Sequence, residues 1–142
     1  MLTDKKSPSI IREVSPEAKN DAVSSRHIRE FAAVTRRLLH GSDLFLDEGA
    51  VVEVLVNPAS GLLKTGPAQR RMMRHLKRLA EARATAETPR DGLEVRFHET
   101  ESRDHAGETA VRLVRDLAAS SKPGRRLLVL AGGDGFHNDI AT

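Results

Sequence analysis

Three short apolar segments alternate with two amphipathic segments in the second half of the chain, and this alternation limits the fold more than any other feature. Residues 51–56 and 127–131 are almost wholly apolar, as in strands that are buried on both faces. Residues 93–98 alternate apolar and polar side chains with the period of a strand that has one less buried side. Residues 67–84 and 103–119 repeat apolar side chains at helical spacing, which predicts two helices.

The predicted order is therefore strand, helix, strand, helix, strand. Strands joined in this way pair in parallel through right-handed crossovers, and the helices cover the sheet. The expected fold class is α/β, a three-layer parallel sheet with helices on both faces. The strand 127–131 is expected to be buried. The helix 103–119 is expected to turn six apolar side chains inward: Ala106, Ala110, Val111, Leu113, Val114 and Leu117.

Residues 1–49 are polar and mixed in charge, whereas apolar and glycine-rich segments concentrate in residues 50–142. This contrast predicts an N-terminal extension followed by one folded unit. Within the extension, apolar residues at helical spacing predict an amphipathic helix that begins near Ser15, breaks near Asn20 and ends at Gly41. Such a helix can dock on the core, on a partner or on a membrane.

Composition excludes several classes of function. No segment approaches the roughly 18 apolar residues that span a bilayer, and the charged N-terminus lacks the apolar core of a signal peptide. We therefore expect a cytoplasmic protein. The absence of cysteine excludes disulfides, thiolate metal sites and a cysteine nucleophile. With four Phe and no Trp or Tyr, the chain has little material for stacking bases, so nucleic acid is not an expected partner.

The predicted helix 67–84 is strongly basic, although the formal net charge of the whole chain is only +3. Phosphates or anionic lipid headgroups can meet such a surface. A charged face is also the ordinary way in which a helix is solvated. The basic residues of this helix are Arg70, Arg71, Arg74, Lys77, Arg78 and Arg83.

Polar or glycine residues follow each predicted strand, at the edge of a parallel sheet where ligands bind. Gly132-Gly133-Asp134-Gly135 follows the third strand and runs into a predicted helix start. Glycines allow backbone N–H groups to approach phosphate oxygens, and a helix N-terminus adds a favourable dipole. Asp134 suits Mg²⁺ binding or acceptance of the proton of an attacking hydroxyl. Taken alone, the same four residues also fit an ordinary tight turn.

Asn57-Pro58-Ala59-Ser60-Gly61 follows the first strand. A serine hydroxyl and a glycine N–H suit a phosphate, the side chain of Asn57 suits a ribose or a base edge, and Lys64 adds charge. The same dipeptides are common in turns. Thr100 follows the second strand. His98 and His105 lie among acidic residues, but their spacing lacks the H-E-x-x-H pattern, so no metal cluster is expected there.

Together, the three loops resemble the catalytic domain of diacylglycerol kinases, sphingosine and ceramide kinases and their bacterial lipid kinase relatives. That family places Asn-Pro-x-Ser-Gly after its first strand, Thr followed shortly by His-Ala after its second, and Gly-Gly-Asp-Gly-Thr after its third. The resemblance covers about residues 51–142, the N-terminal, nucleotide-binding half of that domain. The counterparts here are Asn57 to Gly61, Thr100 with His105-Ala106, and Gly132 to Gly135.

The resemblance implies an enzyme that uses ATP and Mg²⁺ to phosphorylate a lipid hydroxyl, on a diacylglycerol or a sphingoid base at a membrane surface. It also implies a fold like that of NAD kinase and phosphofructokinase. The residues implied to contact ATP are Asn57, Ser60, Gly61 and Thr100, those implied to line its phosphates are Gly132, Gly133 and Gly135, and the catalytic and metal-binding residue is Asp134.

The chain departs from the family's pattern in three places. Phe136 stands where the family usually has Thr or another small residue, which removes a hydroxyl beside the phosphates. Asn138 and Asp139 match the family's Asn-Glu pair, but the resemblance gives His137 no role. The family adds a second, mostly β domain that carries lipid-binding and further catalytic residues. A chain that ends at Thr142 is therefore expected to be a truncated part that is inactive as a kinase alone.

Other functions stay open at this point. NAD kinase and phosphofructokinase share the Gly-Gly-Asp-Gly turn, although the segment from Asn57 to Gly61 favours a lipid kinase. A non-catalytic nucleotide-binding or interaction module, whose N-terminal helix recruits a partner, is an alternative of a different class. Peripheral contact with a membrane and a homodimer are both compatible with the sequence, which does not identify the acceptor lipid.

Overall fold

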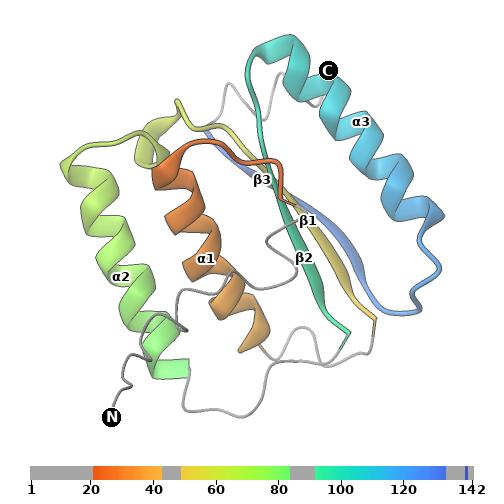
Figure 1. The fold of residues 1–142 in the computed structure, drawn as a ribbon, viewed down its shortest axis with the longest axis horizontal. Coiled ribbons are helices and arrows are strands. Elements are labelled where there is room, and N and C mark those ends of the chain that lie inside the picture. The colour runs from red at the N-terminus through yellow and green to blue at the C-terminus, as the bar shows by residue number, and fades with distance from the viewer. Residues whose placement is uncertain (1–20, 43–48, 84–91, 134–139, 141–142) are drawn as a thin grey trace, which may run out of the picture.

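The computed structural model describes residues 21–42, 49–83, 92–133 and 140. The strands form one parallel sheet in the order β2-β1-β3 (Figure 1). The α/β class is confirmed, and the strands and the two later helices lie within about two residues of their predicted bounds. In chain order, the elements are α1 (Arg26–His40), β1 (Val51–Val56), the 3-10 helix η4 (Gly61–Leu63), α2 (Pro67–Arg83), β2 (Glu94–Glu99), α3 (Arg103–Ala119) and β3 (Arg126–Ala131).

The carboxyl ends of the three strands finish at the same level. Val56 at the end of β1 is in register with Glu99 of β2 and with Ala131 of β3. The pairing continues one step further, because the Asn57 N–H donates to the Ala131 carbonyl at 2.9 Å and the Thr100 N–H donates to the Val56 carbonyl at 2.9 Å. The three loops therefore begin at one edge of the sheet, as the sequence predicts.

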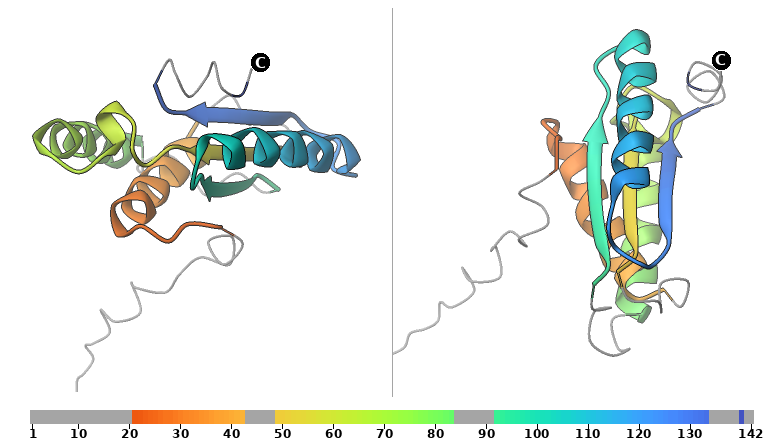
Figure 2. Two further views of the ribbon diagram at one scale, coloured as in Figure 1. Left: turned by 90° about the horizontal axis from the view of Figure 1, so that it is seen from above. Right: turned by 90° about the vertical axis from the view of Figure 1, so that its right-hand side faces the viewer.

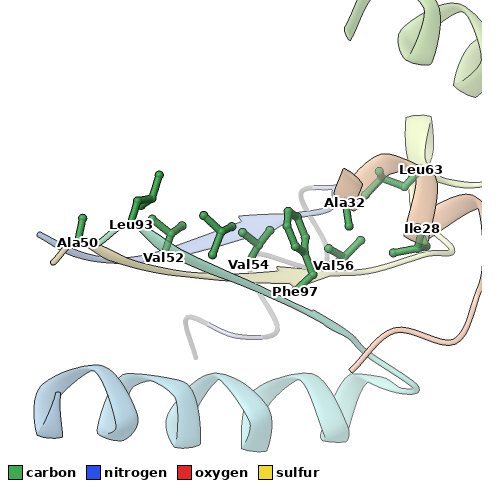
Figure 3. Packing of buried hydrophobic residues seen from close by; sticks show 10 residues of the cluster. Ile28, Ala32, Ala50, Val52, Val54, Val56, Leu63, Leu93 and Phe97 are labelled. Atoms are coloured by element: carbon green, nitrogen blue, oxygen red, sulfur yellow. The ribbon is translucent and has the colours of Figure 1, made fainter. Parts of the chain in front are cut away.

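The larger hydrophobic cluster lies on one face of the sheet. The even-numbered valines of β1 pack there against Phe97 of β2 and against Ile28 and Ala32 of α1. Figure 3 shows these side chains on the face that is turned away from α3. Because β1 is flanked by strands on both sides and covered on both faces, all of its residues are buried.

The opposite face of β1 is covered by α3 (Figure 2), where Leu55 packs against Ala106, Ala110 and Leu113. Val111 and Val114 were predicted to face inward, and this prediction is wrong: their side chains are 51% and 52% exposed. Both residues lie off the helical stripe formed by the buried residues of α3. Their apolar character reflects an ordinary mixed surface and not the core.

The helix α1 belongs to the folded unit. Ile28 and Ala32 contact the sheet, while Val34 packs against Met73 and Ala80 of α2, so α1 lies between the sheet and α2 (Figure 1). Docking on the core is thus the alternative that the structure shows for this helix.

The described part of the N-terminal helix begins at Arg26. The expected start near Ser15 and the break near Asn20 lie outside the described residues, and residues 21–25 are not helical. Ala22 instead forms a parallel bridge beside β2. Its N–H donates to the Phe97 carbonyl at 2.8 Å, and its carbonyl accepts from the Glu99 N–H at 2.9 Å. Pairing with the edge of β2 therefore replaces helical hydrogen bonds in this segment.

The prediction that β3 is a buried strand is also wrong for the described part of the chain. Leu127 and Val129 are 38% and 40% exposed. On their face of the sheet, the α1 cluster covers β1 and β2, whereas Leu128 and Leu130 on the other face pack against the α3 cluster. An apolar sequence alone does not show which strand lies at the edge of a sheet.

Candidate functional site

The loop after β1 is held together by two side chains that the family resemblance implies to contact ATP. The Asn57 Oδ1 accepts from the Ala59 N–H at 3.1 Å, and the Ser60 hydroxyl donates to the Asn57 carbonyl at 3.0 Å. The Ser60 carbonyl accepts from the N–H groups of Leu63 and Lys64, which begins η4. The polar groups of Asn57 and Ser60 therefore shape this loop, as in Asx-type turns.

Two glycines leave open space at this edge. Gly61 has a positive φ of 29°, and a Cβ built at Gly61 or at Gly133 would meet no atom within 4 Å. Gly132 follows β3 directly and is half-buried. Asp134 and Gly135 lie outside the described residues, as do residues 136–139. The described structure thus leaves room for at least a methyl group beside the backbone at Gly61 and Gly133.

Thr100 is buried at the end of β2, and the turn that follows it is fixed by His105. The Ser102 hydroxyl caps α3 by accepting from the His105 N–H at 3.1 Å. The His105 Nδ1 accepts from the Glu101 N–H at 3.1 Å, and its Nε2 lies 3.3 Å from the Thr109 hydroxyl. This pattern assigns the proton to Nε2. His105 therefore positions the loop that carries Thr100.

The structure brings together Asn57, Thr100 and Gly132, each of which follows directly after a strand at one edge. Ser60, Gly61 and Gly133 lie one to four residues further along the same loops. The predicted magnesium ligand, Asp134, is outside the described residues. Within the described stretches, no group of three or more His, Asp or Glu side chains is arranged to hold a metal ion.

Glu99 is a residue at this edge that the sequence reasoning missed. It precedes Thr100, and its carboxylate accepts from the N–H groups of Ser24 and Ser25, both at 3.0 Å, and from the Ser25 hydroxyl. Burial acts to raise the pKa of Glu99, but the hydrogen bonds from Ser25 and Ser24 and the nearby His27 outweigh it and hold the pKa below its ordinary value. Glu99 thus ties the start of α1 to the site edge.

Replacing Glu99 by Gln is expected to lower the free energy of unfolding at pH 7 by about 1 kcal/mol, because charge-assisted hydrogen bonds to a partly exposed carboxylate are lost. The folded-state pKa is depressed, so this stabilisation is present above the unfolded pKa and disappears as pH falls through the folded value. Urea unfolding of both proteins at pH 7 and near pH 3 measures this difference.

The neighbouring Glu101→Gln variant is the matched control for Glu99, because its carboxylate is exposed at the same turn. It is expected to unfold like the parent chain at both pH values. A Glu99→Gln difference that is as large in acid as at neutral pH would contradict the assignment of the stabilisation to the ionised carboxylate.

A second feature that sequence reasoning missed is a cluster of charged side chains on the sheet face that carries α3. The Glu53 carboxylate, only 2% exposed, lies 2.6 Å from the His98 Nε2 and 3.0 Å from an Arg96 guanidinium nitrogen. A signal was present, since Glu53 interrupts an otherwise apolar strand and the adjacent strand offers basic residues at alternate positions. The cluster joins β1 to β2 and lies on a sheet face, not at the loop edge.

Comparisons of the chain with protein-family models, with curated proteins and with solved structures found no match. The features of the chain that bear on its function are therefore the three loop motifs and the sheet edge at which their first residues lie side by side.

Proposed function

We propose that this chain is the nucleotide-binding part of an ATP- and Mg²⁺-dependent lipid kinase of the diacylglycerol or sphingoid-base kinase type. The observation that supports the proposal most strongly is the meeting of three motif loops, after β1, β2 and β3, at one carboxyl edge of a parallel sheet. Ligands of open α/β sheets bind at this edge. The proposal includes a three-layer fold of the NAD kinase and phosphofructokinase type, since α1 and α3 lie on opposite faces.

In this proposal, the N–H groups of Gly61, Gly132 and Gly133 approach the phosphates of ATP from two sides of the loop edge. The open space at Gly61 and Gly133 leaves room for that approach. Asn57 begins the same loop as Gly61, and Thr100 follows β2, on the other side of β1 from β3. Asp134 would hold Mg²⁺, which when bound neutralises charge on the phosphates.

In the group-transfer step, the lipid hydroxyl oxygen forms a bond to the γ-phosphorus, and the bond from the γ-phosphorus to the bridging oxygen of ADP breaks. The proton of the hydroxyl passes to a carboxylate, for which Asp134 is the proposed acceptor. The chain's own contribution is to bind and orient the phosphates, because phosphoryl transfer is catalysed mainly by positioning and by electrostatic stabilisation.

Calorimetric titration of the 142-residue chain with ATP and Mg²⁺ tests this function. The Gly133→Asp variant is expected to weaken binding at least about tenfold, because a new carboxylate repels the phosphates. The Gly133→Ala variant is the matched control: its Cβ meets no atom within 4 Å, so the fold is kept and no charge is added. Asp134→Ala is expected to reduce the dependence of ATP binding on Mg²⁺.

Three results would argue against this proposal. A folded parent chain that binds no ATP would remove the nucleotide site itself. Binding of NAD in preference to ATP would favour the NAD kinase-like alternative. ATP binding that is unchanged by Gly133→Asp would place the nucleotide elsewhere on the molecule.

A further inference from the structure

The net positive charge of this protein is concentrated on one helix, α2. The 17 residues of α2 contain six basic residues and one acidic residue, a formal charge of +5. The whole chain carries +3, so everything outside α2 sums to −2. The 17 residues of α3 carry three basic and three acidic residues, a formal charge of zero. Two helices of the same length in one fold therefore differ in charge by five, and solvation alone does not require this difference.

Five basic side chains of α2 lie on one arc of the helix. Gln69, Met73 and Ala80 mark the buried side of the helix, which packs on α1 through Met73 and Ala80. With 3.6 residues per turn, the exposed basic residues fall on an adjoining arc of the helix that points away from α1. We call this arc the α2 basic face. Its basic residues are Arg70, Arg71, Arg74, Lys77 and Arg78, all of which are exposed, and the exposed Glu81 lies on the same arc at its C-terminal end.

No salt bridge neutralises the α2 basic face within the described part of the chain. On α3, by contrast, Arg112 lies 3.6 Å from Asp116 one turn away. Arg70, Arg74 and Arg78 follow one another at four-residue spacing, so like charges stand directly above each other and destabilise the isolated helix. An external anionic surface relieves this repulsion.

Exposed apolar side chains lie beside the α2 basic face, outside its arc. Leu79 is 54% exposed and lies on the same four-residue ridge of α2 as Arg71 and His75. Leu62 of η4, which directly precedes α2, is 53% exposed. Arginine with exposed leucine is the combination that binds the headgroup layer of an anionic membrane, where cations meet phosphate and short apolar side chains enter the acyl boundary.

From this surface, we infer that the α2 basic face docks on a membrane that contains anionic phospholipids. The inference rests on the proposed function, because docking would hold the nucleotide edge close to a lipid acceptor. Pro67, the first residue of α2, follows the loop after β1 by a few residues, so the docking helix leads away from the nucleotide edge. The vesicle measurement itself needs no nucleotide, and its outcome is therefore separate from that of the ATP titration.

Sedimentation of the full 142-residue chain with vesicles tests the inference. Binding is expected to vesicles of phosphatidylcholine and phosphatidylserine in a ratio of about 7:3, and not to phosphatidylcholine alone. The Arg71→Gln/Arg78→Gln variant is expected to bind about 30-fold more weakly, since each arginine near an anionic surface contributes about 1 kcal/mol, or fivefold. Raising the salt from about 0.1 M to about 0.5 M is expected to weaken binding of the parent chain.

The control variant, Arg112→Gln/Arg115→Gln, removes the same charge from the exposed face of α3 and is expected to lose less than about threefold in vesicle binding. Equal losses in both variants would overturn the inference, because net charge and not the α2 basic face would then drive binding. Failure to bind anionic vesicles would overturn it too and would favour an acidic protein or RNA as the occupant.

Competition with inorganic phosphate distinguishes docking on a lipid surface from binding at a discrete phosphate site. At equal ionic strength, phosphate and chloride are expected to weaken vesicle binding equally. Selective, saturable inhibition by phosphate would overturn docking in favour of a site for a soluble phosphate compound.

Discussion

Replacing Phe97 by alanine is expected to lower the free energy of unfolding by about 4 kcal/mol. The ring is fully buried on β2, and it packs edge-on against Phe31 of α1 with the ring centroids 6.4 Å apart. The Arg36 guanidinium lies 5.0 Å from the centre of the same ring. Deleting the ring therefore removes apolar contact and opens a cavity between the sheet and α1. Chemical unfolding followed by circular dichroism measures the change.

A loss of this size is a large part of the stability of a small domain, so the alanine variant alone can fail to fold. Phe97→Leu keeps most of the volume and is expected to cost less than about 2 kcal/mol. Leu62→Ala, at an exposed position, is expected to cost less than about 0.5 kcal/mol. If Phe97→Ala cost no more than Leu62→Ala, the packing of Phe97 between the sheet and α1 would be contradicted.

Replacing Glu53 by alanine is expected to cost about 3 kcal/mol. The substitution leaves His98 and Arg96 beside an apolar gap in place of the carboxylate that both contact. His98 is buried, and its Nδ1 already has no partner in the described part of the chain, so the ring cannot gain a second hydrogen bond without moving. Arg96 is less affected, because its side chain is 32% exposed and can turn toward water.

The sharper test for Glu53 is a pair of variants. Removing both buried partners in Glu53→Leu/His98→Leu replaces a buried ionic contact by apolar side chains and is expected to be more stable than Glu53→Ala. Chemical unfolding midpoints of Glu53→Ala and of Glu53→Leu/His98→Leu measure this difference in stability. A double variant that is less stable than the single one would show that Glu53 does not act mainly through His98.

The loops of the candidate site could be predicted from the sequence, because topology follows from the order of local patterns. Once strands and helices alternate, crossovers force parallel pairing, and Asn57, Thr100 and Gly132 must start at one edge. Hydrogen bonds between side chains and distant backbone were not predictable in this way. Glu99 reaches Ser24 and Ser25 over more than 70 positions, and no local spacing signals such a contact.

By itself, the sequence determined the helices and strands from 51 to 131 and their parallel arrangement, since periodicity and turn residues act over a few positions. Only the tertiary structure decided which of these surfaces are covered. It packed α1 against the sheet, paired Ala22 with the edge of β2, left Val111 and Val129 exposed and buried Glu53. Burial depends on contacts between segments that are distant in the sequence. The local sequence pattern around an apolar or charged residue is the same whether that residue is buried or exposed.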